Sequence, residues 1–205
     1  MSVPPPGPPG PSEGGSPLGR PLGEASQSAG GPSRALTQTA AGGRSAPGGP
    51  RRARRWITRA AAETERLGAE LAAELGPDGA LLLTGELGSG KTVLARGVAA
   101  ALGIDPRQVV SPSFNLIREH RGAAGGPPRM VHVDLYRLEP REAAGLGLDE
   151  VLAGPGVKVV EWAERLPWPL PGGAATLALR LRRLPGGGDE EREIVEIAPC
   201  DRQLP

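Results

Sequence analysis

One short segment constrains the fold of this chain more than any other. The octet Gly-Glu-Leu-Gly-Ser-Gly-Lys-Thr occupies positions 85–92. It follows the apolar run Ala-Leu-Leu-Leu-Thr, which is typical of a buried strand, and it precedes a helical pattern over 91–102 that ends at Gly103. A strand, a glycine-rich turn and a helix in this order are the setting of a phosphate-binding P-loop. We therefore predict a P-loop nucleotide-binding domain, because a chance glycine turn would lack this context.

Each residue type in the octet meets one requirement of holding a triphosphate. The glycines allow backbone angles and a close approach that a Cβ would block, so successive N–H groups can surround an anion. Lys91 places a positive charge against the β- and γ-phosphates, and the Thr92 hydroxyl is a ligand for Mg²⁺. We predict ATP and Mg²⁺ as cofactors. The predicted nucleotide-binding residues are Glu86, Leu87, Gly88, Ser89, Gly90, Lys91, Thr92 and Val93.

A P-loop enzyme also needs an acid at the end of a neighbouring strand to orient Mg²⁺. Glu161 ends a β-branched run, and Asp134 follows a second apolar run. Either acid taken alone has the alternative of being a surface residue at a strand end. We predict catalytic roles for Lys91, Asp134 and Glu161, and metal binding by Thr92 and Glu161.

Four further residues are candidates for accessory roles. Ser111 and Ser113 follow the P-loop helix, where many P-loop proteins keep a loop that senses the γ-phosphate; the alternative is a simple turn. Trp162 has two interpretations, as a cover for a nucleotide or partner surface and as a packing residue. Arg137 is a candidate for the arginine that stabilises transition-state charge, and a residue from a partner protein is the alternative.

Composition divides the chain into three parts. Residues 1–55 are rich in Pro, Gly, Ser and Ala and contain almost no large apolar side chain, so they cannot bury enough surface to offset the entropy of ordering. We predict a disordered tail over 1–55, a P-loop ATPase domain over 56–200 and a short C-terminal tail over 201–205.

The apolar pattern predicts the α/β class, with a single P-loop NTPase domain whose central mixed sheet is flanked by helices. The predicted elements are a helix from Ile57 to Leu75, strands over 80–84, 114–120, 130–137 and 157–160, a broken helix over 140–152, and an antiparallel hairpin of 177–181 with 194–197 at the sheet edge.

Charge and cysteine content limit the partners of the protein. The chain has 24 basic and 23 acidic side chains, so it lacks the strong positive field that draws proteins onto nucleic acid. If RNA is involved, we expect another protein to hold it. Cys200 is the single cysteine, so no disulfide partner exists within the chain. The longest apolar runs are far shorter than the roughly 20 residues of a membrane span. We expect a cytoplasmic protein with no membrane segment.

Four different motifs follow one another along the chain. They are Leu83-Thr84-Gly85-Glu86-Leu87-Gly88-Ser89-Gly90-Lys91-Thr92-x-x-x-Arg96-Gly97, Ser111-Pro112-Ser113-Phe114, His132-Val133-Asp134-Leu135-Tyr136-Arg137-Leu138, and Val160-Glu161-Trp162-Ala163-Glu164. In this order they resemble the TsaE family, bacterial ATPases required to form N6-threonylcarbamoyladenosine (t6A) at position 37 of tRNAs that read ANN codons. The resemblance covers about residues 60 to 200.

The resemblance implies a single P-loop domain that binds ATP and Mg²⁺ and hydrolyses ATP slowly when alone. It also implies that the protein acts with the TsaD–TsaB complex, which would be its route to tRNA. By position, Lys91 and Thr92 match the family's phosphate and magnesium residues, and Asp134 and Glu161 match its two acids. Ser113 stands where the family usually has threonine, which keeps the hydroxyl.

Two other functions remain open at this stage. A P-loop kinase for a small molecule would need an acceptor pocket and a basic lid, but the only basic stretch after the P-loop falls on the predicted edge hairpin. A nucleotide-gated binding module would use ATP to close the Ser111 loop and would have little need for hydrolysis.

Overall fold

The computed structural model describes residues 37–38, 53–122, 126–143, 145–167, 170 and 175–198. The described elements belong to one compact unit over residues 35–205. In chain order they are β1 (Thr37–Gln38), β2 (Arg55–Thr58), α1 (Ala61–Leu75), β3 (Ala80–Thr84), α2 (Lys91–Ala101), a 3₁₀ turn (Pro106–Gln108), β4 (Ile117–Arg121), β5 (Pro128–Asp134), α3 (Pro140–Ala143), α4 (Leu148–Ala153), β6 (Val157–Glu161), a 3₁₀ turn (Ala163–Arg165), β7 (Thr176–Arg183) and β8 (Arg192–Ile197).

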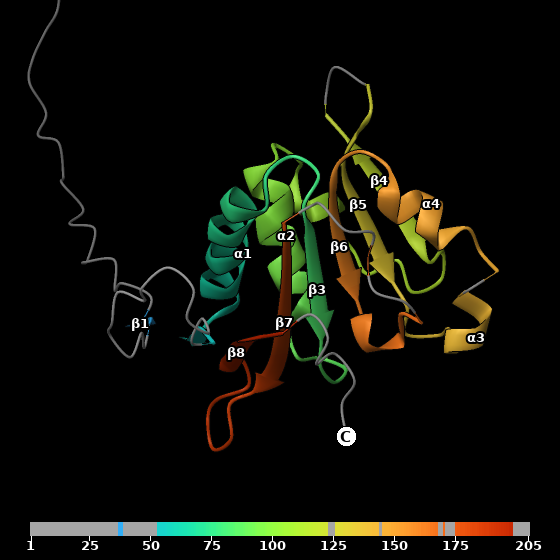
Figure 1. Cartoon of the computed structure of the whole chain (residues 1–205). Helices are drawn as coiled ribbons and strands as arrows, with labels where there is room; N and C mark the ends of the chain where they lie inside the picture. Colours follow the sequence, from blue (N-terminus) through green and yellow to red (C-terminus); the bar gives the residue numbers. More distant parts are fainter. Residues whose placement is uncertain are drawn as a thin grey trace, which may run out of the picture. The chain divides into compact units, whose positions relative to one another are not determined.

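The described strands form one mixed sheet in the order β1-β2-β8-β7-β3-β6-β5-β4 (Figure 1). β3 lies at its centre and pairs in parallel with β6 on one side and β7 on the other, while β5 is parallel to β6. Parallel strands end at the same edge of a sheet, so the chain after β3, β5 and β6 meets at one place. This topology brings together segments that are distant in the sequence.

Helices cover both faces of the sheet. Successive residues of β3 face opposite ways, and every one of its side chains is buried. Leu81 and Leu83 belong to a core with α1 and α2, whereas Leu82 belongs to a second core with α4 and the turn after β6. α1 and α2 approach closely at Gly68, where a Cβ would lie 2.2 Å from the Leu94 carbonyl oxygen. This contact fixes the position of α2, the helix that follows the P-loop, against α1.

The predicted α/β fold, with a mixed central sheet flanked by helices, is confirmed. The P-loop strand is β3, the helix after it is α2, and the β-branched run forms the inner strand β6. These elements were predictable because each is a continuous apolar or periodic segment bounded by glycine.

The N-terminal helix, by contrast, begins later than predicted. Ile57 lies in β2, and α1 begins only at Ala61. Trp56 and Thr58 are the buried residues of β2 and alternate with more exposed neighbours, as in a strand. β2 pairs with β8 in an antiparallel register, so this segment satisfies its backbone hydrogen bonds in the sheet.

The predicted position of the hairpin at the sheet edge is wrong. β7 and β8 do pair with each other, but β7 also pairs with β3 and β8 also pairs with β2. The edge strands of the described sheet are β1 and β4. The prediction failed because β2, which covers the outer side of β8, is short and its spacing resembles that of the adjoining helix.

Turns shift two further boundaries. β4 begins at Ile117, three residues later than predicted, because Leu116 has a left-handed φ of 64° and the chain turns there. β5 ends at Asp134 and does not reach Arg137, because the Asp134 carboxylate accepts the N–H of Tyr136 and closes a turn. The predicted broken helix is two short helices, α3 and α4.

The predicted disordered tail falls mostly outside the described residues, as do Cys200 and the tail over 201–205. Within the predicted tail, the structure describes β1 and residues 53–55, the last of which begins β2. In the described part of the chain, no helix has the length and apolar character needed to cross a membrane.

Candidate nucleotide-binding site

The loop over residues 85–90 joins the end of β3 to the start of α2. Gly85 has a φ of 136°, and a Cβ there would lie 2.1 Å from the carbonyl oxygen of Leu181, so no side chain fits. Gly90 has a φ of 100° and immediately precedes α2. The free N–H groups and the positive dipole end of α2 follow directly. This is a backbone arrangement that binds phosphate.

Lys91 is buried within this loop. Its ammonium group donates to the carbonyl oxygens of Gly85 and Glu86 at 2.6 and 2.9 Å, and it lies 4.1 Å from the centre of the Trp162 ring. Burial lowers the pKa of Lys91, and the negative charge of Glu161 opposes that shift. A phosphate group beside Lys91 would favour its charged form, so the site suits an anion.

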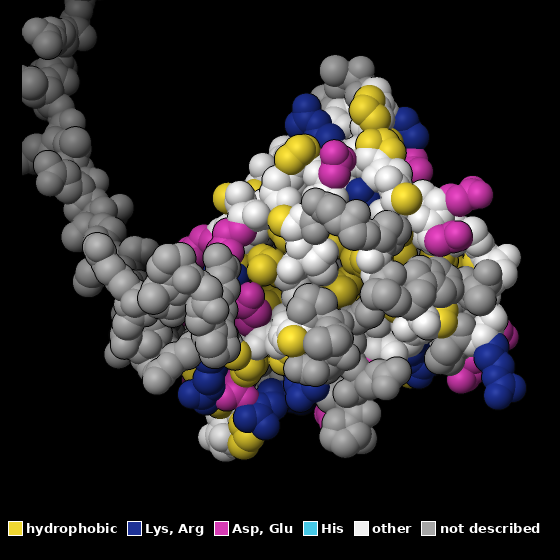
Figure 2. Space-filling view, in the orientation of Figure 1, with side chains coloured by type: hydrophobic (Ala, Val, Ile, Leu, Met, Phe, Trp, Pro, Cys, Tyr) yellow, Lys and Arg dark blue, Asp and Glu magenta, His cyan; other side chains and the backbone are white. Residues whose placement is uncertain are grey.

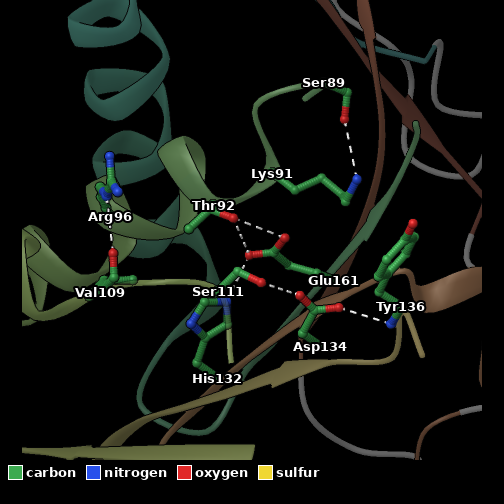
Figure 3. Close-up of polar contacts among 10 residues, drawn as sticks. All are labelled: Ser89, Lys91, Thr92, Arg96, Val109, Ser111, His132, Asp134, Tyr136 and Glu161. Carbon is green, nitrogen blue, oxygen red and sulfur yellow. Dashed lines mark hydrogen bonds and ion pairs between the residues drawn. The ribbon is translucent and has the colours of Figure 1, made fainter. Parts of the chain in front are cut away.

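Glu161 and Thr92 meet at the edge of the sheet because β6 is the parallel neighbour of β3. The Thr92 hydroxyl lies 2.9 and 3.1 Å from the two carboxylate oxygens of Glu161 and donates to them (Figure 3). His132 of β5 lies on the other side, with its Nε2 atom 2.9 Å from Glu161 Oε1. His132 is fully buried, so Glu161 is held between a P-loop hydroxyl and an inner imidazole.

Asp134 lies beside Glu161, because the two acids are register partners at the ends of β5 and β6. The Ser111 hydroxyl donates to Asp134 Oδ2, and the Tyr136 N–H donates to Oδ1 at 2.9 Å (Figure 3). Both carboxylate oxygens of Asp134 therefore accept a hydrogen bond that fixes the orientation of the group.

The segment that carries Ser111 is tied to the P-loop helix. Arg96 of α2 donates from Nε to the carbonyl oxygen of Val109 at 3.0 Å, two residues before Ser111 (Figure 3). Ser113 follows in the same segment and also lines the cavity described below. A movement of this segment would therefore disturb the hydrogen bond to Asp134 and the hydrogen bond from α2 together.

Aromatic side chains form one wall of the site. Trp162 adopts a left-handed φ of 58°, a conformation that costs a non-glycine residue about 1 kcal/mol or more. Its ring lies 4.9 Å from that of Tyr136, centre to centre. Nearby, the Arg137 guanidinium lies 4.3 Å from the ring centre of Phe114, which is 84% exposed.

These groups surround a cavity of about 290 Å³. The structure places all of the predicted site residues around it except Glu86, whose carbonyl oxygen binds Lys91 behind the loop. The lining residues are Leu87, Gly88, Ser89, Gly90, Lys91, Thr92, Val93, Ser111, Ser113, Asp134, Tyr136, Arg137, Glu161, Trp162 and Arg192. The roles assigned to these residues remain predictions.

A comparison with protein families gives the relationship of the chain. The model of the family described as "Threonylcarbamoyl adenosine biosynthesis protein TsaE" matches residues 58–193, which span β3, the P-loop and both acids. The chain belongs to the TsaE family. The resemblance noted in the four sequence motifs is thereby confirmed.

Individual TsaE proteins match over different lengths. The tRNA threonylcarbamoyladenosine biosynthesis protein TsaE of Bacillus subtilis is 39% identical over 148 residues, which are 72% of this chain and 87% of that protein. The protein of the same description from Nostoc sp. is 40% identical over 109 residues, which are 51% of this chain and 65% of the relative. A crystal structure of Bacillus subtilis YdiB matches with a TM-score of 0.56 and 36% identity, covering 74% of this chain and 89% of that chain.

Sequence reasoning assigned no role to four residues in or beside this TsaE site: His132, Tyr136, Glu164 and Arg192. His132 precedes Asp134 by two residues on β5, a spacing that places both on one face, but the sequence does not show which face meets the site. Burial raises the pKa of Glu164, and the positive charge of Lys91 opposes that shift. Arg192 reaches the cavity from β8, and no local pattern in the sequence indicates this.

Proposed function

We propose that this TsaE protein is a Mg²⁺-dependent ATPase that acts with the TsaD–TsaB complex in forming t6A at position 37 of tRNA. The observation that carries the proposal is the contact of Thr92 with Glu161 directly behind the phosphate-binding loop. The relatives, which are tRNA threonylcarbamoyladenosine biosynthesis proteins, indicate the pathway. The complex would bring the protein to tRNA, in the cytoplasm.

The donor set fits magnesium. A hydroxyl and a carboxylate supply hard oxygen ligands of the kind that Mg²⁺ prefers, and both belong to groups already oriented by hydrogen bonds. The described residues contain no group of three or more His, Cys, Asp or Glu side chains placed to hold a metal. Phosphate oxygens and water would complete the shell, as is usual where Mg²⁺ binds together with a nucleotide. When bound, Mg²⁺ neutralises charge that develops on the phosphoryl oxygens.

The residues of the chain would bind the phosphates, position Glu161 and orient the attacking water. The loop N–H groups and Lys91 bind the β- and γ-phosphates and stabilise the charge that spreads over the γ-phosphoryl oxygens. Glu161 is kept in position by Thr92 and His132. Asp134, held on both oxygens, would orient the water that attacks the γ-phosphorus in line with the departing ADP oxygen.

Turnover by the isolated protein should be slow. Arg137 is a candidate for the charge-stabilising arginine, but its guanidinium is stacked on Phe114. An arginine correctly placed on the transferring group is worth about 10³ to 10⁵ in rate. Stimulation by the partner complex follows if that complex repositions Arg137 or supplies its own arginine.

The test is ATP hydrolysis with Mg²⁺ by the purified protein, alone and with TsaD–TsaB and tRNA, with t6A measured in the same reactions. We expect stimulation by the complex and loss of both hydrolysis and t6A in Lys91→Ala. Arg66→Ala is the matched control, because Arg66 is an exposed cation on α1 outside the cavity. It should behave as wild type.

Three results would redirect the proposal. Consumption of ATP only after addition of a small-molecule acceptor would indicate a kinase. An Asp134→Asn or Glu161→Ala protein that binds ATP without hydrolysing it and still supports t6A formation would indicate a nucleotide-gated binding module. Intact nucleotide binding without any stimulation would show that the partner is a different one.

A further inference from the structure

One arginine of the P-loop helix has a contact that nucleotide binding does not explain. Figure 2 shows Lys and Arg side chains that stand out at the upper tip and along the lower edge of the molecule. Arg96 is only partly exposed and, within the described residues, forms no ion pair. It does not line the nucleotide cavity either. Its hydrogen bond from Nε to the carbonyl oxygen of Val109, at 3.0 Å, therefore needs another explanation.

Arg96 is carried by a helix that is held firmly in place. α2 packs closely on α1, because a Cβ on Gly97 would lie 1.8 Å from the carbonyl oxygen of Glu65. Arg96 adjoins Gly97 and follows Thr92 by four residues, so it projects from the same side of the helix as the proposed magnesium-binding hydroxyl. The guanidinium thus extends from a fixed helix that begins at the phosphate-binding loop.

The connection from α2 to β4 is held differently at its two ends. At the far end, the Leu116 carbonyl oxygen accepts the backbone N–H of Asp134 at 2.9 Å. At the near end, no backbone group of Val110 or Ser111 pairs with the backbone of another described residue. A stretch without such hydrogen bonds can change its path at little cost. The hydrogen bond from Arg96 holds this end at the point where the chain leaves the core.

This hydrogen bond fixes the peptide plane that leads to Ser111. The Val109 side chain is fully buried in the core, so packing sets its position. The Val109 carbonyl and the N–H of Val110 belong to one rigid plane, whose direction is set by the hydrogen bond from Arg96. From this plane the chain reaches Ser111, whose hydroxyl donates to Asp134 Oδ2 (Figure 3). Arg96 therefore controls where the Ser111 hydroxyl points.

We propose that Arg96 is a positioning residue for ATP hydrolysis, which holds the Ser111 hydroxyl against Asp134 and thereby keeps that carboxylate oriented. The inference rests on the proposed function, since it takes Asp134 as the group that orients the attacking water. Arg96 contacts neither the nucleotide nor the metal, so its removal changes the rate of hydrolysis and not the affinity for nucleotide.

The first test does not depend on catalysis. Phe114, the single phenylalanine of the chain, is 84% exposed in the segment over 109–116, and chymotrypsin cleaves after aromatic residues. We expect the full chain to be cut after Phe114 about 10-fold faster in Arg96→Met, which keeps the apolar stem and removes the donor. Arg107→Ala is the matched control, because Arg107 belongs to the same connection but pairs with Asp105. It should be cut at the wild-type rate.

The second test is ATP hydrolysis in a double-mutant cycle with Ser111→Ala, together with calorimetric titration of MgADP. Arg96→Met should lower the maximal rate about 10- to 100-fold and leave the Kd for MgADP unchanged. In the Ser111→Ala protein the same change should have little further effect, because the hydroxyl that Arg96 positions is gone. Arg96→Lys can donate to a carbonyl oxygen and should recover part of the rate.

Two results would overturn the inference. One is a folded Arg96→Met protein that hydrolyses ATP at the wild-type rate. The other is a loss that Arg96→Met adds in full to that of Ser111→Ala, because Arg96 would then act by another route. Should Arg96→Met fail to fold, the cycle is run with Arg96→Lys. Absence of hydrolysis by the wild type would instead reject the proposed function, and cleavage after Phe114 would still show whether Arg96 holds the segment.

Discussion

The buried histidine behind Glu161 offers a way to separate orientation of the acid from the stability of the fold. We predict that His132→Leu lowers the rate of ATP hydrolysis while leaving the protein folded. His132 Nε2 lies 2.9 Å from Glu161 Oε1, and His132 does not line the cavity. Its effect on ATP must therefore pass through Glu161.

The expected magnitudes follow from the two nitrogen atoms of the ring. Loss of the hydrogen bond to the Glu161 carboxylate costs about 1.5 to 3 kcal/mol. Nδ1 of His132 is buried and has no partner in the described part of the chain, and removing such an atom returns about 1 to 3 kcal/mol. These contributions nearly cancel, so the free energy of unfolding should change by no more than about 2 kcal/mol. Removal of a residue that orients a metal ligand typically costs about 10- to 100-fold in activity.

The assay is hydrolysis of ATP at increasing Mg²⁺ concentration, with urea unfolding of the same samples. His132→Leu should show a lower maximal rate and require more Mg²⁺. His132→Gln is the matched control, because the amide nitrogen of glutamine reaches about as far as Nε2 and can donate to Glu161. It should recover most of the loss.

A folded His132→Leu protein with the rate and Mg²⁺ requirement of the wild type would refute this reasoning. So would a loss that His132→Gln shares in full, because the hydrogen bond to Glu161 would then not be the cause.

Two further predictions concern stability and can be checked by urea unfolding. Gly85→Ala should destabilise the protein by more than about 3 kcal/mol, because its Cβ would meet the Leu181 carbonyl oxygen at 2.1 Å. Gly76→Ala, where nothing lies within 4 Å and only the backbone conformation (φ 67°, ψ −174°) opposes a side chain, should cost about 1 to 3 kcal/mol; equal losses would contradict the packing argument. The hydrogen bond from Arg182 lowers the pKa of Glu193 below its ordinary value of 4.5, so the carboxylate contributes stability that is complete above that pH and is lost as the pH falls through the lowered pKa. Glu193→Gln should therefore be less stable at pH 7 and should lose less stability than the wild type on acidification to pH 3; parallel profiles of the two proteins would count against this ion pair.

The parts of the site that were predictable from sequence are those encoded in contiguous segments. Each residue of the octet at 85–92 indicates its own part in phosphate binding, and the strand and helix that position the octet flank it directly. Glu161 and Asp134 were predictable because each ends an apolar run, and parallel strands bring such ends together. The family resemblance identifies these segments as parts of one site, but it does not give the distances between their side chains.

The parts that were not predictable depend on pairing between distant segments. Arg192 is an ordinary polar residue of a strand until β8 is placed beside β7, and only then does it reach Gly88. His132 alternates with Val131 and Val133 in a strand whose faces the sequence does not identify. Both faces of β5 are buried, so alternation alone could not show that His132 contacts an acid.

The strand β2 has a consequence for where the protein can be shortened. Composition suggests that residues 1–55 are dispensable, yet β2 begins at Arg55, occupies the outer side of β8 and joins Arg55 to the buried Glu193. A protein cut at the start of α1 would expose a row of unpaired backbone groups along β8, which is a template for aggregation by strand addition. It would also loosen the strand that begins with Arg192, so a truncation meant only to remove the tail would reach the nucleotide cavity.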